Sequence, residues 1–193
     1  MKICVYGAAS SLIDKSFIES GEELGRKIAQ RGHGLVFGGG RNGMMGAAAR
    51  GVRQENGYVL GISPAFFEEN NAEVSFPDCS EFIHTETMRE RKQLLDEKSD
   101  AFIITPGGIG TFDEFFEILT LKQLGRHNKA IVIYNMNGFF DGMAKSLYKM
   151  VIDKFITNDC FELCKVVNSA DEALDYIEQY DPKDIDLSKV KIR

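Results

Sequence analysis

Short apolar runs alternate with longer amphipathic stretches along the chain. Stretches with helical spacing of apolar positions predict helices over 17–30, 44–54, 112–124, 139–155 and 170–180, and a further, highly charged helix opens at Met88. The apolar runs have the length of strands and are Ile3–Tyr6, Leu35–Phe37, Val59–Ile62, Phe82-Ile83, Ala101–Ile104, Ile131–Tyr134 and Val166-Val167. Strands that are apolar on both faces and separated by helices are typical of a parallel sheet covered on both sides. We therefore expect a doubly wound, Rossmann-like α/β fold with helices on both faces of the sheet.

The chain is predicted to form one domain. Its 193 residues contain no internal repeat, low-complexity tract or linker, and a chain of this length buries roughly 70 % of its unfolded surface. We place the domain at residues 1–181 and a polar C-terminal tail at 182–193, which is either loosely ordered or an arm for a partner.

Composition narrows the classes of function. The 23 Lys and Arg against 29 Asp and Glu give a net charge of −6, without the basic block typical of nucleic-acid binding. No apolar run approaches the ~20 residues of a membrane span, and the N-terminus lacks the pattern of a signal peptide, so we expect a cytoplasmic protein. Cys160 and Cys164 have helical spacing but no accompanying Cys/His pair, which favours reduced thiols over a zinc site and leaves their role open.

Two glycine-rich turns follow predicted strands. The first contains G-x-G-x-x-G at Gly38, Gly40 and Gly43, but the next strand ends in Ser63-Pro64, not in the acidic residue that would hold the ribose of NAD. This turn is therefore either a tight strand-to-helix connection or a place where the backbone closely approaches some other nucleotide.

The second turn runs from Thr105 to Glu114 and opens a helix that Thr111 could cap. Backbone N–H groups at such a turn converge on an anion, and the helix start adds partial positive charge. No Lys follows the glycines as in a P-loop, so a monophosphate fits better than a triphosphate. The alternative is an ordinary helix N-terminus.

A basic pair, Arg91 and Lys92, lies near the start of the predicted charged helix. Cations there oppose the helix macrodipole and invite an anionic partner, which could be a protein carboxylate or a ligand phosphate. The alternative is a solvated charged face.

Three motifs, in this order and spacing, resemble the LOG family of cytokinin riboside 5′-monophosphate phosphoribohydrolases, which are often mislabelled lysine decarboxylases. The motifs are Gly38-Gly39-Gly40-x-x-Gly43-x-Met45-Gly46, Met88-x-x-Arg91-Lys92 and Pro106-Gly107-Gly108-x-Gly110-Thr111-x-x-Glu114. The likeness extends from Val5 to about Tyr180 and includes a later motif, Gln123-Leu124-Gly125-x-His127-Asn128-Lys129. The chain departs from the family in its first turn, where Tyr6-Gly7-Ala8-Ala9-Ser10 replaces the usual Cys-Gly-Ser-Ser.

The resemblance implies a hydrolase that cleaves the N-glycosidic bond of an adenosine-type 5′-monophosphate, AMP or an N6-substituted cytokinin nucleotide, into free base and ribose 5-phosphate. It assigns the catalytic pair to Arg91 and Glu114. It assigns contacts with substrate or its phosphate to Gly39, Gly40, Gly43, Glu73, Met88, Lys92, Gly107, Gly108, Ile109, Gly110, Thr111, Asp113 and Thr120. It also implies a homo-oligomer, with a dimer expected, and apolar surface for it is offered by Met44-Met45, Phe115-Phe116 and Phe139-Phe140.

Glycosidic cleavage builds positive charge on the sugar, which a carboxylate such as Glu114 would stabilise while accepting a proton from the attacking water. Arg91 beside it would lower the carboxyl pKa, and the chemistry requires no metal or organic cofactor.

Two other functions stay open. A carrier of a nucleotide or of molybdenum cofactor could use the same scaffold and phosphate turn without hydrolysis, although the Arg91/Glu114 pair favours the enzyme. Amino-acid decarboxylation would require a lysine that anchors pyridoxal phosphate, and the surroundings of Lys92 and Lys122 indicate no such site.

Overall fold

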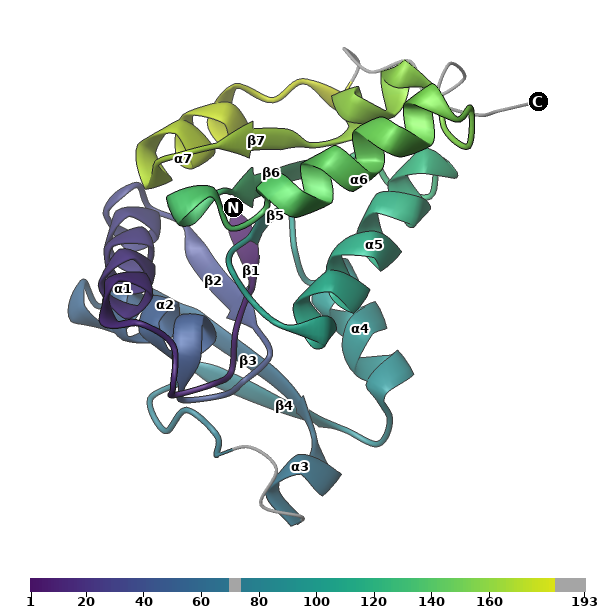
Figure 1. Ribbon diagram of the computed structural model, residues 1–193. Coiled ribbons are helices and arrows are strands. Elements are labelled where there is room, and N and C mark those ends of the chain that lie inside the picture. The colour runs from purple at the N-terminus through teal and green to yellow at the C-terminus, as the bar shows by residue number, and fades with distance from the viewer. Residues whose placement is uncertain (70–73, 183–193) are drawn as a thin grey trace.

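The computed structural model describes residues 1–69 and 74–182, which form a parallel α/β fold (Figure 1). Within these residues, seven parallel strands lie in the order β4-β3-β2-β1-β5-β6-β7. The strands are β1 (Lys2–Tyr6), β2 (Gly34–Phe37), β3 (Val59–Pro64), β4 (Glu81–Thr85), β5 (Ala101–Ile104), β6 (Ala130–Tyr134) and β7 (Lys165–Val167). The doubly wound arrangement predicted from the sequence is confirmed.

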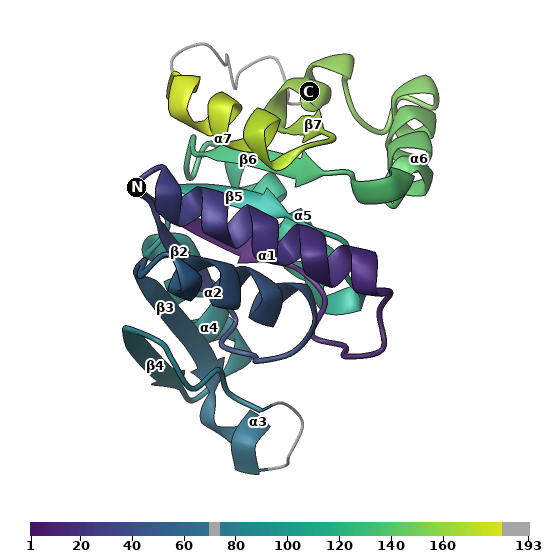
Figure 2. The same ribbon diagram turned by 90° about the vertical axis from the view of Figure 1, so that its left-hand side faces the viewer.

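Helices cover both faces of this sheet (Figures 1 and 2). One face carries α1 (Lys15–Gln30), α2 (Gly43–Gln54) and α7 (Ala170–Gln179), and the other carries α4 (Met88–Glu97), α5 (Ile109–Gln123) and α6 (Asp141–Ile152). A short helix, α3 (Ala65–Glu69), follows β3, and two 3-10 turns, η1 (Met136–Gly138) and η2 (Asn158–Leu163), flank α6.

Alternate side chains of each central strand enter two separate cores. In β1, Ile3 and Val5 pack beneath α1, α2 and α7, whereas Cys4 and Tyr6 pack beneath α4 and α5. This is the period of two that places successive residues on opposite faces of a strand. Both faces of the sheet are therefore packed, and the turns at its carboxyl edge follow directly from buried strands.

Several boundaries differ from those predicted. Helix α5 begins at Ile109, with Gly108 and not Thr111 at the N-cap, because the extended backbone of Gly108 already starts the turn. Helix α3 was not predicted, since five residues are too few to show a helical period. Apart from Pro182, the predicted tail lies outside the described residues.

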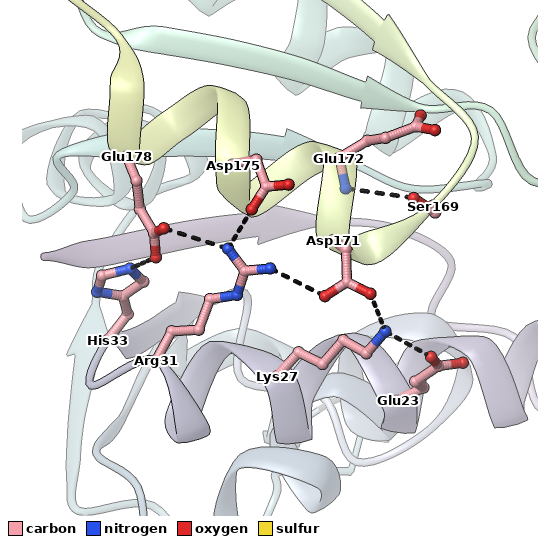
Figure 3. A network of polar contacts seen from close by, with 9 residues as sticks. All are labelled: Glu23, Lys27, Arg31, His33, Ser169, Asp171, Glu172, Asp175 and Glu178. Carbon is pink, nitrogen blue, oxygen red and sulfur yellow. Dashed lines mark hydrogen bonds and ion pairs between the residues drawn. The ribbon is translucent and has the colours of Figure 1, made fainter.

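A network of ion pairs fastens α7 to α1 (Figure 3). Arg31 reaches Asp171, Asp175 and Glu178 at 2.9, 2.6 and 3.1 Å. Lys27 bridges Glu23 and the same Asp171 at 2.9 and 2.6 Å. Shared partners fix these side chains together, so the network contributes more than isolated surface pairs would. It anchors the last described helix to the first.

None of the four cysteines, all of which lie in the described residues, forms a disulfide. Among residues 1–69 and 74–182, no helix has the length and apolar character required to cross a membrane.

The fully buried side chain of Lys122 has unusual surroundings for a cation. Its Nζ donates hydrogen bonds of 2.9 Å to the Lys129 carbonyl and to the Tyr180 hydroxyl, and it lies 4.8 Å from the centre of the Tyr180 ring. No carboxylate pairs with Lys122 within the described part of the chain. Burial lowers the pKa of the Lys122 ammonium to about 8.

Stability is therefore expected to rise with pH as Lys122 loses its proton. In the unfolded chain Lys122 stays protonated up to its ordinary pKa of 10.5, so between the two pKa values the unfolded state binds more protons than the folded state. The free energy of unfolding should increase by about 1 kcal/mol between about pH 7 and about pH 9 because of this group. Urea titrations of wild type and Lys122→Met at both pH values isolate the effect, and an equal pH response in the two proteins would contradict it.

Candidate active site

The main candidate pocket lies where β1 and β5 run side by side. Their following helices, α1 and α5, leave toward opposite faces, which opens a crevice at the carboxyl ends of the strands. The Ala8 N–H donates to the Pro106 carbonyl at 3.0 Å and so holds the two loops together. The pocket has a volume of about 310 Å³ and is lined by Gly7, Ala8, Ala9, Ser10, Met45, Phe67, Met88, Arg91, Gly108, Gly110, Thr111, Asp113 and Glu114.

The start of α5 supplies the pocket with hydrogen-bond donors. No side chain caps this helix at Gly108, although the first N–H groups of an α-helix have no partner within the helix itself. Gly108, Gly110 and the buried Thr111 line the pocket at this point. Uncapped N–H groups, the positive end of a helix and a hydroxyl form a suitable cradle for a small anion.

A buried ion pair forms the wall beside this helix start. Arg91 Nη1 of α4 donates to Glu114 Oε1 of α5 at 2.6 Å, and the two side chains are only 5 % and 7 % exposed. Arg91 Nε donates to the Ile62 carbonyl of β3 at 3.2 Å, which fixes the guanidinium against the sheet. The anionic partner of Arg91 is thus a protein carboxylate, one of the two alternatives left by the sequence.

Burial raises the pKa of the Glu114 carboxyl, while the charge and hydrogen bond of Arg91 oppose that rise. The net direction is upward, which corrects the lowering expected from Arg91 alone, because burial outweighs the effect of the guanidinium. A carboxylate with a raised pKa is a stronger proton acceptor near neutral pH.

The first glycine turn makes room for this pair. A methyl group at Gly38 would collide with Arg91 Nη2, and Gly39 has a φ of +87° and closely approaches the Phe82 ring. Of the predicted contacts in this turn, Gly39, Gly40 and Gly43 are buried and do not line the pocket. The turn thus leaves space for the Arg91 guanidinium, and these three glycines do not themselves face the pocket.

The remaining predicted contacts are distributed over several places. Lys92 is held by Asp113 at 3.2 Å and by Glu117, and it lines a second cavity between α4 and α5 that Glu114 also borders. Thr120 lines a groove between α5, α6 and η2, and the Ile109 side chain is 91 % exposed. Gly107 packs on Thr111 and Ala8, and Glu73 falls outside the described residues.

The pocket also contains residues that sequence reasoning did not assign to it. Ala8, Ala9 and Ser10 belong to the turn that follows β1. In the sequence, only the departure of this turn from the family pattern drew attention to these residues. Phe67 comes from α3, a helix too short for its period to be recognised. The later motif that contributed to the resemblance has a structural role away from the pocket, because Lys129 Nζ pairs with Asp96 at 2.8 Å.

Comparisons with known proteins agree with the fold and the motifs. Residues 45–177 match the family model described as "Possible lysine decarboxylase". A Mycobacterium tuberculosis protein named cytokinin riboside 5′-monophosphate phosphoribohydrolase is 38 % identical over 172 residues, which cover 89 % of this chain and 90 % of that protein. An Arabidopsis thaliana protein of the same name is 32 % identical over 186 residues, covering 96 % and 86 %.

Among solved structures, a molybdenum cofactor binding protein from Rippkaea orientalis aligns with a TM-score of 0.69 at 23 % identity, covering 92 % of this chain and 94 % of its own. At that identity the likeness concerns the fold alone. The strand order therefore places the chain among the Rossmann-like α/β proteins, and its pocket lies at the β1–β5 crevice. The matched family model and the relatives above 30 % identity place the chain within this class: it belongs to the LOG family.

Two glycines in the turn that leads from β5 into α5 should respond differently to alanine. A methyl group at Gly107 would collide with the Thr111 hydroxyl, whereas at Gly110 it meets open space. We expect Gly107→Ala to lower the free energy of unfolding by about 1–3 kcal/mol, as overpacking does, and Gly110→Ala to leave it unchanged or slightly higher. Urea unfolding of the two variants measures this difference. Equal losses in both would show that the turn is not packed as described.

Proposed function

We propose that this protein hydrolyses the N-glycosidic bond of an adenosine-type nucleoside 5′-monophosphate, releasing the base and ribose 5-phosphate. The observation that carries the proposal is the buried Arg91–Glu114 pair, 2.6 Å apart, in one pocket with the uncapped start of α5. The family's members in M. tuberculosis and A. thaliana are named for this reaction, which supports the assignment.

Each part of the pocket has a role in this reaction. The 5′-phosphate binds at Gly108–Thr111, where N–H groups and the helix dipole favour an anion. Glu114 lies one turn further along α5, beside the sugar, and stabilises the positive charge that develops as the C1′–N bond breaks. Its carboxylate accepts a proton from the water whose oxygen bonds to C1′. The base leaves with the electrons of the broken C1′–N bond and takes up a proton, so that the water molecule is divided between the two products. Arg91 orients Glu114 and keeps it charged.

A molybdenum-cofactor or nucleotide carrier is the second candidate, and the likeness to the R. orientalis protein supports it at the level of fold alone. The ion pair favours hydrolysis, because a carrier has no use for a buried carboxylate directed at its cargo.

We further propose that the protein works in the cytoplasm. None of its four cysteines forms a disulfide, which fits a reducing compartment.

We also propose a homodimer formed through α5, α6 and η2. No residue of α6 is buried, and exposed apolar side chains on or beside it include Tyr148, Met150, Ile152, Phe155 and Phe161. Met44, Met45, Phe115 and Phe140, expected as candidates for this surface, are buried in the core, while Phe116 and Phe139 are partly exposed. The family resemblance implies that Thr120 contacts substrate, but Thr120 lines this groove and not the main pocket. A second copy of the chain docked on the groove would allow Thr120 to contact the nucleotide bound by that copy.

Loss of the phosphate should damage turnover as well as binding. If Gly108–Thr111 holds the phosphate, its binding energy orients the sugar, so adenosine should show a lower kcat and a higher KM than AMP. Chromatography of bases released from AMP, adenosine, CMP and GMP tests the function and its specificity. Equal turnover of AMP and adenosine would exclude the phosphate assignment, and tight AMP binding without release of base would support the carrier.

A charged side chain introduced into this groove should dissociate the proposed dimer. Light scattering of wild type should give about 43 kDa, twice the 21.6 kDa of one chain, because burial of apolar area drives association. Met150→Glu should shift the mass to that of a monomer, whereas Leu12→Glu, at an exposed position outside this groove, should not. A monomeric wild type at micromolar concentration would overturn the proposal.

A further inference from the structure

The two ends of the main pocket differ in chemistry. Gly108, Gly110 and Thr111 follow β5, and Ser10 follows β1, so the donors gather at these two central strands. The apolar lining residues Met45, Phe67 and Met88 instead follow β2, β3 and β4. Because β5, β1, β2 and β3 are consecutive in the sheet, the end of β3 lies about 14 Å from that of β5, three strand spacings away. This is the scale of an extended nucleoside monophosphate.

The ion pair occupies the middle of this span. Arg91 contacts the carbonyl of Ile62 in β3 and the carboxylate of Glu114 in α5, so it connects the two ends. With the phosphate at the start of α5 and the sugar beside Glu114, the base extends toward Met45, Phe67 and Met88.

Phe67 lines the apolar end of the pocket, and its ring is supported by a neighbouring aromatic side chain. Its side chain is half-buried, and the ring of Phe66 packs edge-on against it, with centroids 5.0 Å apart and an interplanar angle of 86°. Phe66 itself does not line the pocket. A supported aromatic ring with two flexible thioether side chains nearby is suited to hold a flat, apolar group by stacking and dispersion.

We propose that Phe67 is the platform on which the base of the substrate stacks, and that it determines which nucleotides are used. This inference rests on the proposed function and deepens it. The free energy of stacking depends on the area of the base and not on the hydrogen-bonding groups at its edge. The preference among substrates therefore follows the apolar surface of the base. AMP with an isopentenyl group at N6 is bound better than AMP, and AMP better than CMP.

Phe67 contacts a part of the substrate whose position changes little during the reaction. Loss of its ring therefore weakens the ground state and the transition state together, which raises KM and leaves kcat nearly unchanged. This response separates Phe67 from Glu114, whose loss lowers kcat.

The test compares wild type with Phe67→Ala, Phe67→Leu and the matched control Phe66→Ala. Steady-state constants are measured for N6-isopentenyl-AMP, AMP and CMP, with ribose 5-phosphate as a competitive inhibitor that lacks a base. Phe67→Ala should raise KM for the two adenine nucleotides about 5- to 100-fold, remove the preference among the three, and leave the inhibition constant of ribose 5-phosphate within about twofold. Phe66→Ala should change KM much less.

Phe67→Leu keeps apolar bulk without the ring, so it gives an intermediate KM and provides the measurement if the alanine variant fails to fold. The proposal would be overturned if Phe67→Ala left the KM values of the three nucleotides unchanged. It would also be overturned if the variant bound ribose 5-phosphate more weakly by the same factor as the nucleotides. If wild type releases no base from any nucleotide, the proposed function fails by itself. Calorimetric binding of AMP to wild type and Phe67→Ala then still decides the platform, which requires AMP to bind more weakly to the variant.

Discussion

The site depends on one interaction, the buried pair between Arg91 of α4 and Glu114 of α5. Two charges removed from water stay charged only where each satisfies the other and the remaining hydrogen bonds are made. The Ile62 carbonyl accepts one of those bonds, and Gly38 lacks the side chain that would displace the guanidinium. The end of β2, the end of β3 and two helices thus all constrain a single carboxylate. Its pKa is raised by burial, and it lies beside the helix start that would bind a phosphate.

This arrangement explains how one fold can serve both carriers and enzymes. The crevice between β1 and β5 follows from strand order, and the uncapped start of α5 needs only glycine at the turn. Those features would suffice for a protein that binds a phosphorylated ligand without reacting with it. Hydrolysis requires in addition a carboxylate held next to the sugar, and the Arg91–Glu114 pair is a feature of this chain that a carrier would not need.

The strands were predictable because residues such as Ile103 and Val132 are buried on a sheet covered on both faces, which produces unbroken apolar runs. The convergence of Arg91 and Glu114 was not predictable from spacing, since it depends on the packing of two helices, and it entered through the family resemblance. Phe115 and Phe116 show a second limit: adjacent helical positions differ by about 100°, so one is buried and the other is 38 % exposed. Phe67 gave no periodic signal at all.

The most direct test of the account is a double-mutant cycle on base release from AMP. Wild type, Arg91→Met, Glu114→Gln and the double variant would be compared by kcat/KM, with AMP binding followed calorimetrically. If the pair acts as one unit, each single variant should lose about 10²–10³-fold or more, and the double variant should be scarcely worse than either. Turnover like that of wild type in Glu114→Gln, or losses that multiply in the double variant, would contradict the mechanism.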